Sequence, residues 1–218
     1  MATWVKIILG LFAVGLLFAV VGSVFLFTFV QNMTNPKKTQ EIANTIVTLT
    51  DPLPPPFEYG RMNFSMLGWS GALIDSTDSQ ACFFLIKKPM KEGEDNAQKT
   101  IDKVVKGEAS LPDTSGSLPG SGASKAAAKS NMMVESNDVL DCGGTKLYYV
   151  KGKAVLRRTG AAAKGDTSAA PKEVETFLGG ADPKGGQTAI FIMGQQPDSS
   201  KHLNMEEIKA FLGTIKAI

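Results

Sequence analysis

Histidine and cysteine are almost absent from this sequence, which has one histidine, His202, and two cysteines, Cys82 and Cys142. Zinc clusters and disulfide-rich scaffolds need more of these residues at short spacing, so both classes are excluded. A surplus of positive charge is also lacking, because 23 Lys and Arg residues stand against 21 Asp and Glu residues. This balance argues against a dedicated nucleic-acid-binding protein, and no nucleic-acid partner is expected.

Charged residues are missing altogether from Ile7 to Val30, a run made of large apolar and small residues. As a helix, this run would be roughly 36 Å long, enough to cross a hydrocarbon core of about 30 Å. A cleaved signal peptide has a shorter apolar region that ends in a small-x-small site, which is not found here. The run therefore predicts a single transmembrane helix that contacts the lipid bilayer.

The orientation of this helix follows from the few residues that precede it. Lys6 lies before the run, and Lys37 and Lys38 lie after it, so the positive-inside count is nearly even. Because so little chain precedes the run, we expect the amino terminus in the cytoplasm. The protein is then a single-pass protein of the inner (plasma) membrane with an exported C-terminal domain.

Small residues recur at four-residue spacing within the apolar run, at Gly15, Ala19 and Ser23. Such a stripe allows two membrane helices to approach closely, which predicts a homodimer packed through these residues. The alternative is that small residues are simply common in membrane helices.

Composition divides the chain into three parts. Residues 1–35 form the anchor, and residues 36–56 form a juxtamembrane helix and a Pro-rich stalk. Residues 57–218 form one domain, interrupted at 109–130 by a Ser-, Gly- and Ala-rich insert that is predicted to be flexible because it cannot bury enough apolar area to offset the entropy of ordering it.

The domain is predicted to be α+β, with a mostly antiparallel sheet and a few packed helices. Helical spacing and end signals predict helices at Thr39–Leu49, Asn96–Lys106 and Ala170–Leu178, and a last helix capped by Asn204 with Glu207 as its capping-box partner. Apolar runs and alternation predict strands at Tyr59–Leu67, Gly68–Ile74, Ala81–Ile86, Met132–Glu135, Lys146–Lys151, Ala154–Thr159 and Thr188–Met193.

The prolines before Phe57, the paired short strands and the final segment MEEIKAFLGTIK give the chain a recognisable pattern. In this pattern the chain resembles membrane-tethered bacterial envelope proteins with a PsbP-like α+β domain. The resemblance implies the same fold and an exported domain. Many such proteins have no assigned biochemistry, so it implies no functional residue.

Catalytic patterns are weak in this sequence. Ser70 lies in Gly-Trp-Ser-Gly-Ala, which departs from the nucleophile elbow at its last position, and only His202 could act as its base. Asp138, Asp141 and Cys142 are interpreted as a polar turn. No catalytic residue, metal ligand or cofactor is therefore predicted, and a serine- or thiol-dependent enzyme is kept as an alternative.

Two features of the domain's sequence could support stability or binding. If the domain is exported, Cys82 and Cys142 could form a disulfide; if it is not, both are free thiols. The second feature is a hairpin turning at residues 151–153, whose basic residues have no acidic residue among them: Lys146, Lys151, Lys153, Arg157, Arg158 and Lys164.

This hairpin predicts a contact with anionic lipid, an envelope protein or another anionic surface. The alternative is a solvated hairpin whose charges discourage aggregation. The sequence as a whole predicts a membrane-anchored, non-enzymatic binding or accessory module, with a structural protein that dimerises through its membrane helix as a further alternative.

Overall fold

The computed structural model describes residues 31–108, 132–156, 172–183, 186–198 and 200–218. The predicted anchor Ile7–Val30, with Gly15, Ala19 and Ser23, lies outside these residues, as does the predicted insert at 109–130. Within the described part of the chain, none of the helices has the length and apolar character needed to cross a membrane.

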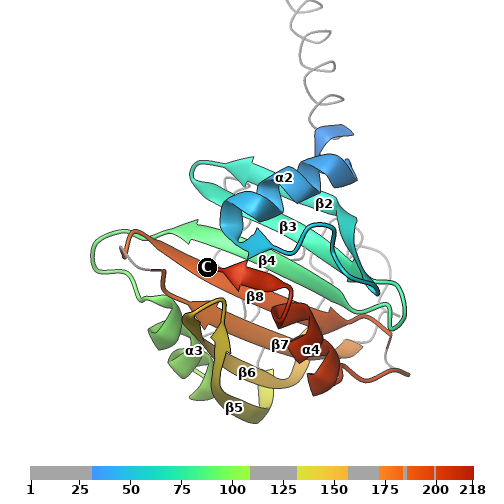
Figure 1. The fold of residues 1–218 in the computed structure, drawn as a ribbon. Coiled ribbons are helices and arrows are strands. Elements are labelled where there is room, and N and C mark those ends of the chain that lie inside the picture. Colours follow the sequence, from blue (N-terminus) through green and yellow to red (C-terminus); the bar gives the residue numbers. More distant parts are fainter. Residues whose placement is uncertain (1–30, 109–131, 157–171, 184–185, 199) are drawn as a thin grey trace, which may run out of the picture.

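The described residues form a seven-stranded antiparallel sheet with the strand order β2-β3-β4-β8-β7-β6-β5 (Figure 1). Strands β2 to β4 form one meander and β5 to β8 form another, and the pairing of β4 with β8 joins them. The elements are α2 (Pro36–Ile46), β1 (Thr48–Leu49), β2 (Phe57–Met66), β3 (Trp69–Ser76), β4 (Cys82–Pro89), α3 (Ala97–Val105), β5 (Met132–Cys142), β6 (Thr145–Leu156), β7 (Lys172–Ala181), β8 (Thr188–Gln196), α4 (Met205–Leu212) and β9 (Ile215–Ala217).

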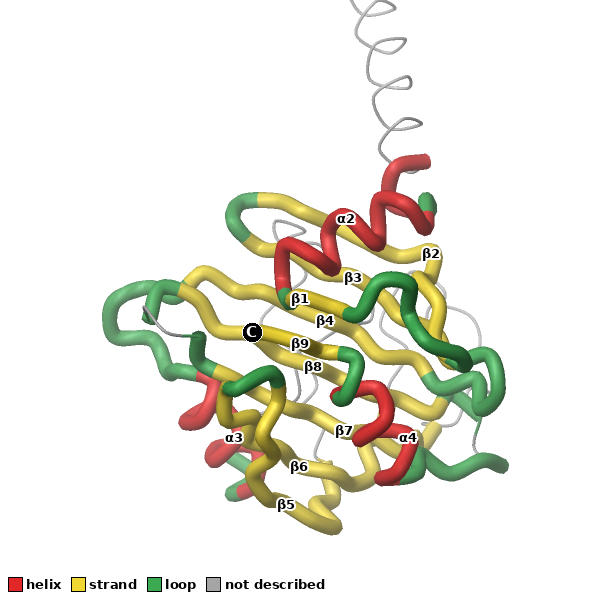
Figure 2. The backbone as a smooth tube through the Cα atoms, viewed as in Figure 1, coloured by secondary structure: helices red, strands yellow, loops and turns green. Residues whose placement is uncertain are grey.

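Each face of the sheet carries its own hydrophobic core. Helices α2 and α4 and the small β1–β9 sheet cover one face, which we call the α2/α4 face (Figure 2). Its centre is a stack of Phe83 and Phe211, whose ring centroids are 4.3 Å apart. Helix α3 packs on the other face, the α3 face, through Ala97, Ile101 and Val104. The central strands therefore need apolar side chains in both directions.

The structure confirms the α+β class and the mostly antiparallel sheet. Strands β4 and β8 are buried on both faces, as their continuous apolar runs predicted. Helix α3 begins after Asn96, whose side chain accepts a hydrogen bond from Lys99 N. Helix α4 is capped by Asn204, but Glu207 forms a different contact from the predicted capping box, because its carboxylate accepts a hydrogen bond from Ser79.

Three predictions of local structure are wrong. Within the segment predicted as a helix at Ala170–Leu178, the described residues 172–178 belong to strand β7, whose side chains alternate between two covered faces. The predicted hairpin at residues 151–153 lies instead within the single strand β6. The true hairpin joins β5 to β6 through Gly143 and Gly144, both with positive φ, so the predicted polar turn at Asp138–Cys142 is part of β5.

Helix α2 belongs to the domain, which differs from the predicted juxtamembrane helix and stalk at 36–56. Its residues Thr39, Ala43 and Ile46 are buried, and β1 directly after it pairs with β9. The prolines follow in a loop from which Leu53 packs against the core of the α2/α4 face. The described chain thus passes from α2 into the sheet without an extended spacer.

Candidate functional site

The two cysteines are far apart in the fold. Cys82 lies on β4 and Cys142 on β5, and strands β8, β7 and β6 separate them. Four strand spacings amount to about 19 Å, whereas a disulfide needs Cα atoms within roughly 7 Å. Both thiols are free, so the disulfide considered for an exported domain is not formed in this fold. Burial, followed by a neighbouring aspartate in each case, raises the pKa of both thiols to about 11, which keeps them protonated and unreactive.

Ser70 and His202 do not meet either. Across the sheet, Ser70 aligns with Ile190 of β8. Glu175, which contacts His202, aligns with Gln196 of the same strand. These two positions on β8 are about 20 Å apart along the strand. Ser70 instead contacts the hydroxyl of Ser65 at 3.3 Å, so the nucleophile–base pair considered in the sequence is not assembled.

His202 is part of a polar network that fixes the segment before α4. Its Nδ1–H donates to Glu175 Oε1 over 2.6 Å, and the backbone N–H of Leu203 donates to Glu175 Oε2 over 2.8 Å. Lys151 Nζ lies 3.8 Å from the same carboxylate. Burial alone would raise the pKa of Glu175, but these contacts outweigh it and lower the pKa below its usual value. The carboxylate of Glu175 on β7 thus connects this strand to β6 and to the segment that precedes α4.

Replacing Glu175 by glutamine is expected to lower the free energy of unfolding by about 1–2 kcal/mol at neutral pH, because a mostly buried charged acceptor is lost. The depressed pKa of Glu175 means that its contribution is present above the carboxyl pKa of the unfolded chain. It disappears as the pH falls through the lower folded-state pKa. Urea unfolding of both proteins between pH 7 and pH 3 checks this, since the two stabilities should converge in acid.

The basic residues of the predicted hairpin do not form one positive surface in the structure. Lys151 contacts Glu175 and Glu135, and Asp141 lies directly opposite Lys146 on β5. Lys153 is exposed, whereas Arg157, Arg158 and Lys164 lie outside the described residues. The sequence segment has no acidic residue of its own, but strand pairing places the acidic residues of β5 beside it. The described part of this surface is therefore of mixed charge.

Strand β5 forms one edge of the large sheet and exposes most of its side chains. Three of the exposed side chains are large and apolar, with exposed fractions of 67% for Met133, 36% for Val134 and 42% for Val139. The exposed acidic residues Glu135, Asp138 and Asp141 alternate with these positions or lie close to them. An edge of this length that presents backbone groups and apolar side chains is suited to pairing with another strand.

A bulge at residues 134–136 shapes this edge. It packs against Gly152, where a Cβ atom would lie 2.0 Å from the carbonyl oxygen of Met133. Beyond the bulge, the two-glycine turn makes Cys142 and Thr145 a hydrogen-bonded pair. Such pairs recur at every second residue of the ladder. The backbone N–H and C=O groups of the residues between them, Asn137, Val139 and Asp141, therefore point away from β6. The N–H of Val139 is partly satisfied by Asp138 Oδ1 at 2.8 Å.

The sequence predicted a strand only at Met132–Glu135 and missed the rest of this edge, because residues 136–142 are too polar to read as a strand. One signal could have revealed it. Gly143-Gly144 is a favoured hairpin dipeptide, and the segments on both sides of it are long enough to pair over ten positions.

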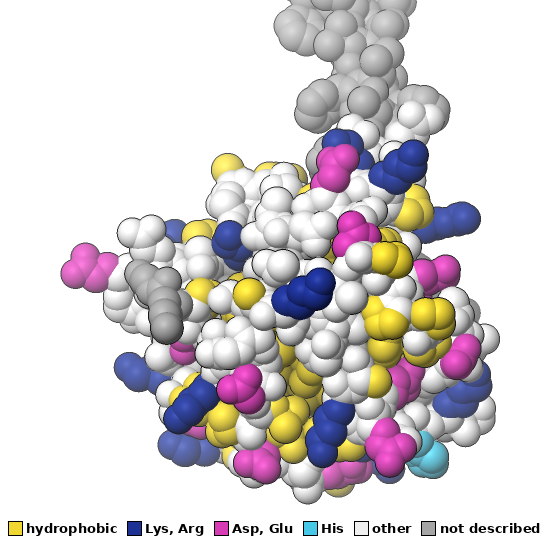
Figure 3. All heavy atoms as spheres, viewed as in Figure 1, with side chains coloured by type: hydrophobic (Ala, Val, Ile, Leu, Met, Phe, Trp, Pro, Cys, Tyr) yellow, Lys and Arg dark blue, Asp and Glu magenta, His cyan; other side chains and the backbone are white. Residues whose placement is uncertain are grey.

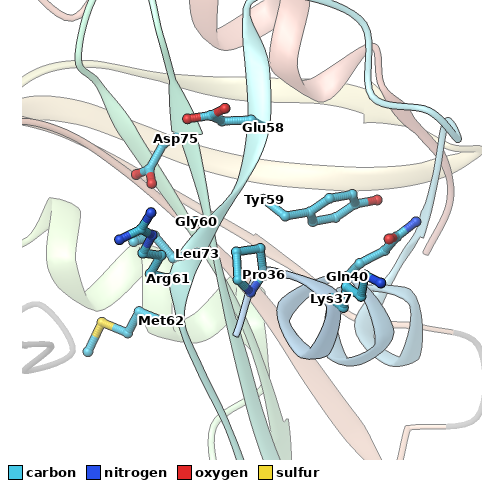
Figure 4. Close-up of a pocket in the computed structure, with 10 residues that line it drawn as sticks. All are labelled: Pro36, Lys37, Gln40, Glu58, Tyr59, Gly60, Arg61, Met62, Leu73 and Asp75. Atoms are coloured by element: carbon cyan, nitrogen blue, oxygen red, sulfur yellow. The ribbon is translucent and has the colours of Figure 1, made fainter. Parts of the chain in front are cut away.

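A groove of about 740 Å³ lies at the opposite edge of the sheet, around β2 (Figure 4). Tyr59 lies on the α2 side of this strand, whereas Asp75, Arg61 and Met62 lie on the other side. The groove therefore runs around the edge strand instead of entering the domain. Burial, and then the charge of Glu58 directly opposite, raises the pKa of Asp75. No cluster of potential metal ligands occurs in the described part of the chain.

Comparison of the chain with protein-family models and with curated proteins found no match. The structure and the sequence alone therefore support the proposals below.

Proposed function

We propose that the protein is a single-pass, membrane-anchored binding module whose exported domain captures an extended segment of a partner along β5. The observation that carries this proposal is the exposure of this edge, where Met133, Val134 and Val139 remain uncovered. Strand addition would satisfy the outward backbone groups of β5 and cover these side chains. The anchor follows from the uncharged run Ile7–Val30.

The charge of β5 favours a basic partner over a second copy of the same strand. Glu135, Asp138 and Asp141 are the only charged residues in this strand. Two antiparallel copies would bring these carboxylates together, and like charges across a strand pair are destabilising. An extended partner segment with alternating Lys or Arg and β-branched residues would instead pair with the carboxylates and cover Val134 and Val139.

Replacing Asn137 by proline (Asn137→Pro) tests the role of this edge directly. The outward N–H of residue 137 is not needed for pairing with β6, so proline is tolerated there, as it is on other edge strands. The expected result is a loss of about tenfold or more in affinity for an alternating Lys-Val octapeptide, because one backbone hydrogen bond and close approach are both lost. Fluorescence anisotropy of the labelled peptide with the full chain in nanodiscs measures this.

The matched control is Asn137→Thr, which keeps the backbone N–H and suits a strand. It should bind the Lys-Val peptide as the original chain does, and neither protein should bind a Glu-Val octapeptide. Equal binding of the Lys-Val peptide by the Pro and Thr variants would overturn the proposal. Binding of the acidic peptide with similar affinity would remove the role assigned to the carboxylates of β5.

A further inference from the structure

The start of the described chain is clamped onto β2. The side-chain amide of Asn63, which is buried, donates to the carbonyl oxygens of Asn32 and Met33, each at 3.1 Å. The same amide donates to Thr39 Oγ1 at 3.0 Å, and this hydroxyl donates to Gly60 O at 2.8 Å. Residues 32–39 therefore form one rigid unit with the edge strand.

This clamp places β2 next to the end of the apolar run. Val30 ends the run and Asn32 is already bonded to Asn63, so the two peptide steps from Val30 to Asn32 span at most about 7 Å. Figure 1 shows α2 and the β2–β3 hairpin together at the end of the domain where the described chain begins. Any membrane that holds the run must therefore lie close to this edge.

The tip of the β2–β3 hairpin carries an apolar residue in an unfavourable position. Leu67 has φ 52° and is 80% exposed, the most exposed large apolar side chain among the described residues. Asn, Asp or Gly normally occupies such a left-handed position, because a longer side chain is strained there. Met62, also on β2, is 39% exposed. Neither exposure nor strain benefits the domain in water.

Charged side chains are exposed on the two elements that form this edge of the domain. Lys37, Lys38 and Arg61 are exposed on α2 and β2. The acidic groups beside them are Glu41, which pairs with Lys38, and the Glu58–Asp75 pair across β2 and β3. Figure 3 shows Lys and Arg side chains gathered at this end of the domain, with acidic ones among them. Basic groups next to exposed apolar ones are typical of surfaces that contact anionic lipid.

We propose that the β2 edge is a membrane-contact surface, which rests on the anchoring bilayer with Leu67 and Met62 in the lipid interface and Lys37 and Arg61 at anionic headgroups. This inference rests on the proposed anchor but is independent of peptide capture at β5. The opposite edge of the sheet, β5, is then held away from the bilayer and open to partners.

A spin label at residue 67 tests the contact in the full chain. Leu67→Cys is labelled and reconstituted in nanodiscs of phosphatidylcholine with phosphatidylglycerol, and collisions with a water-soluble nickel chelate are measured. The matched control carries the label at Lys209→Cys, an exposed position on α4. Native Cys82 and Cys142 label slowly because burial raises their pKa to about 11. We expect a several-fold lower collision rate at residue 67 than at residue 209.

Each outcome bears on a different part of the argument. If the chain resists extraction by carbonate but the collision rates at residues 67 and 209 are equal, the membrane contact is overturned. The proposed anchor is then left intact. Extraction of the chain by carbonate would overturn the anchor and the contact together. Lys37→Gln with Arg61→Gln should raise the collision rate at residue 67 in anionic nanodiscs but not in pure phosphatidylcholine. An unchanged rate would remove the headgroup role of these two residues.

Leu67→Asn separates membrane contact from folding. Asparagine tolerates positive φ, so the equilibrium constant for folding should rise about threefold. Contact should weaken at the same time, seen as faster hydrogen exchange of the hairpin amides in nanodiscs. A lower stability of this variant would show that Leu67 serves the fold, and unchanged exchange would contradict its insertion.

Discussion

Replacing Phe211 by alanine is expected to lower the free energy of unfolding by about 4 kcal/mol, because a fully buried aromatic ring leaves a cavity that its neighbours cannot fill. Phe211 is 0% exposed and lies between two other rings. It stacks on Phe83, and its centroid lies 5.5 Å from that of Phe57 in an edge contact. Together with Ile208 and Leu212 of the same helix, it packs α4 into the core of the α2/α4 face.

Urea unfolding of the full chain, followed by circular dichroism, measures this loss. Lys209→Ala is the control, because residue 209 is exposed on the same helix and alanine favours helices. The control should change the stability by less than about 0.5 kcal/mol. A loss of under about 1 kcal/mol for Phe211→Ala would show that α4 is not packed on the aromatic cluster as described.

The two glycines of the β5–β6 turn are expected to differ sharply when each is replaced by alanine. Both have positive φ, 58° at Gly143 and 75° at Gly144, so each substitution costs about 1 kcal/mol in backbone strain. A Cβ at Gly143 would also lie 2.7 Å from the Cα of Ala217, whereas a Cβ at Gly144 meets nothing within 4 Å. Gly143→Ala must displace β9 and should cost about 3 kcal/mol in total.

Hydrogen exchange distinguishes this mechanism from simple turn strain. In Gly143→Ala, the amides of β9 and of its partner β1 should lose protection, whereas in Gly144→Ala they should not. Equal stabilities of the two variants would contradict the close approach of the turn to the C-terminal strand.

The parts of the fold that the sequence predicted well are those with unambiguous local signals. Strands β4 and β8 have continuous apolar runs, and both faces of the sheet are covered there. Helices α3 and α4 have an asparagine cap and an apolar stripe. These signals depend on short-range chemistry that any tertiary environment would preserve.

Strand β7 shows why local signals fail elsewhere. Val174, Phe177 and Leu178 have helical spacing, yet in the strand Phe177 packs on the α2/α4 face and the other two pack on the α3 face. Gly179, predicted as a helix cap, lies against the side chain of Leu147. A strand covered on both faces has no alternation to detect, and a glycine required by packing looks like a helix stop.

The part of β5 beyond the predicted strand Met132–Glu135 was not predicted, for the opposite reason. Its side chains are exposed on both sides, so its composition is that of a loop. Gly152, predicted as a turn, is in fact required by the bulge in β5. The candidate site thus depends on pairing between segments, and only the fold reveals how Glu135 and Asp141 lie beside the lysines of β6.

The pairing of β1 with β9 has a consequence for biosynthesis. Thr48 and Leu49 pair with residues 215–217, and the edge of β4 that does not face β3 pairs with β8. Both partners are synthesised long after the strands that they join. Residues up to 196 must therefore leave the ribosome before β4 is paired on both of its edges, and residues up to 217 before β1 is paired. The sheet therefore does not close strand by strand as the chain emerges, because the β4–β8 pair that joins its two meanders and the β1–β9 pair both form late.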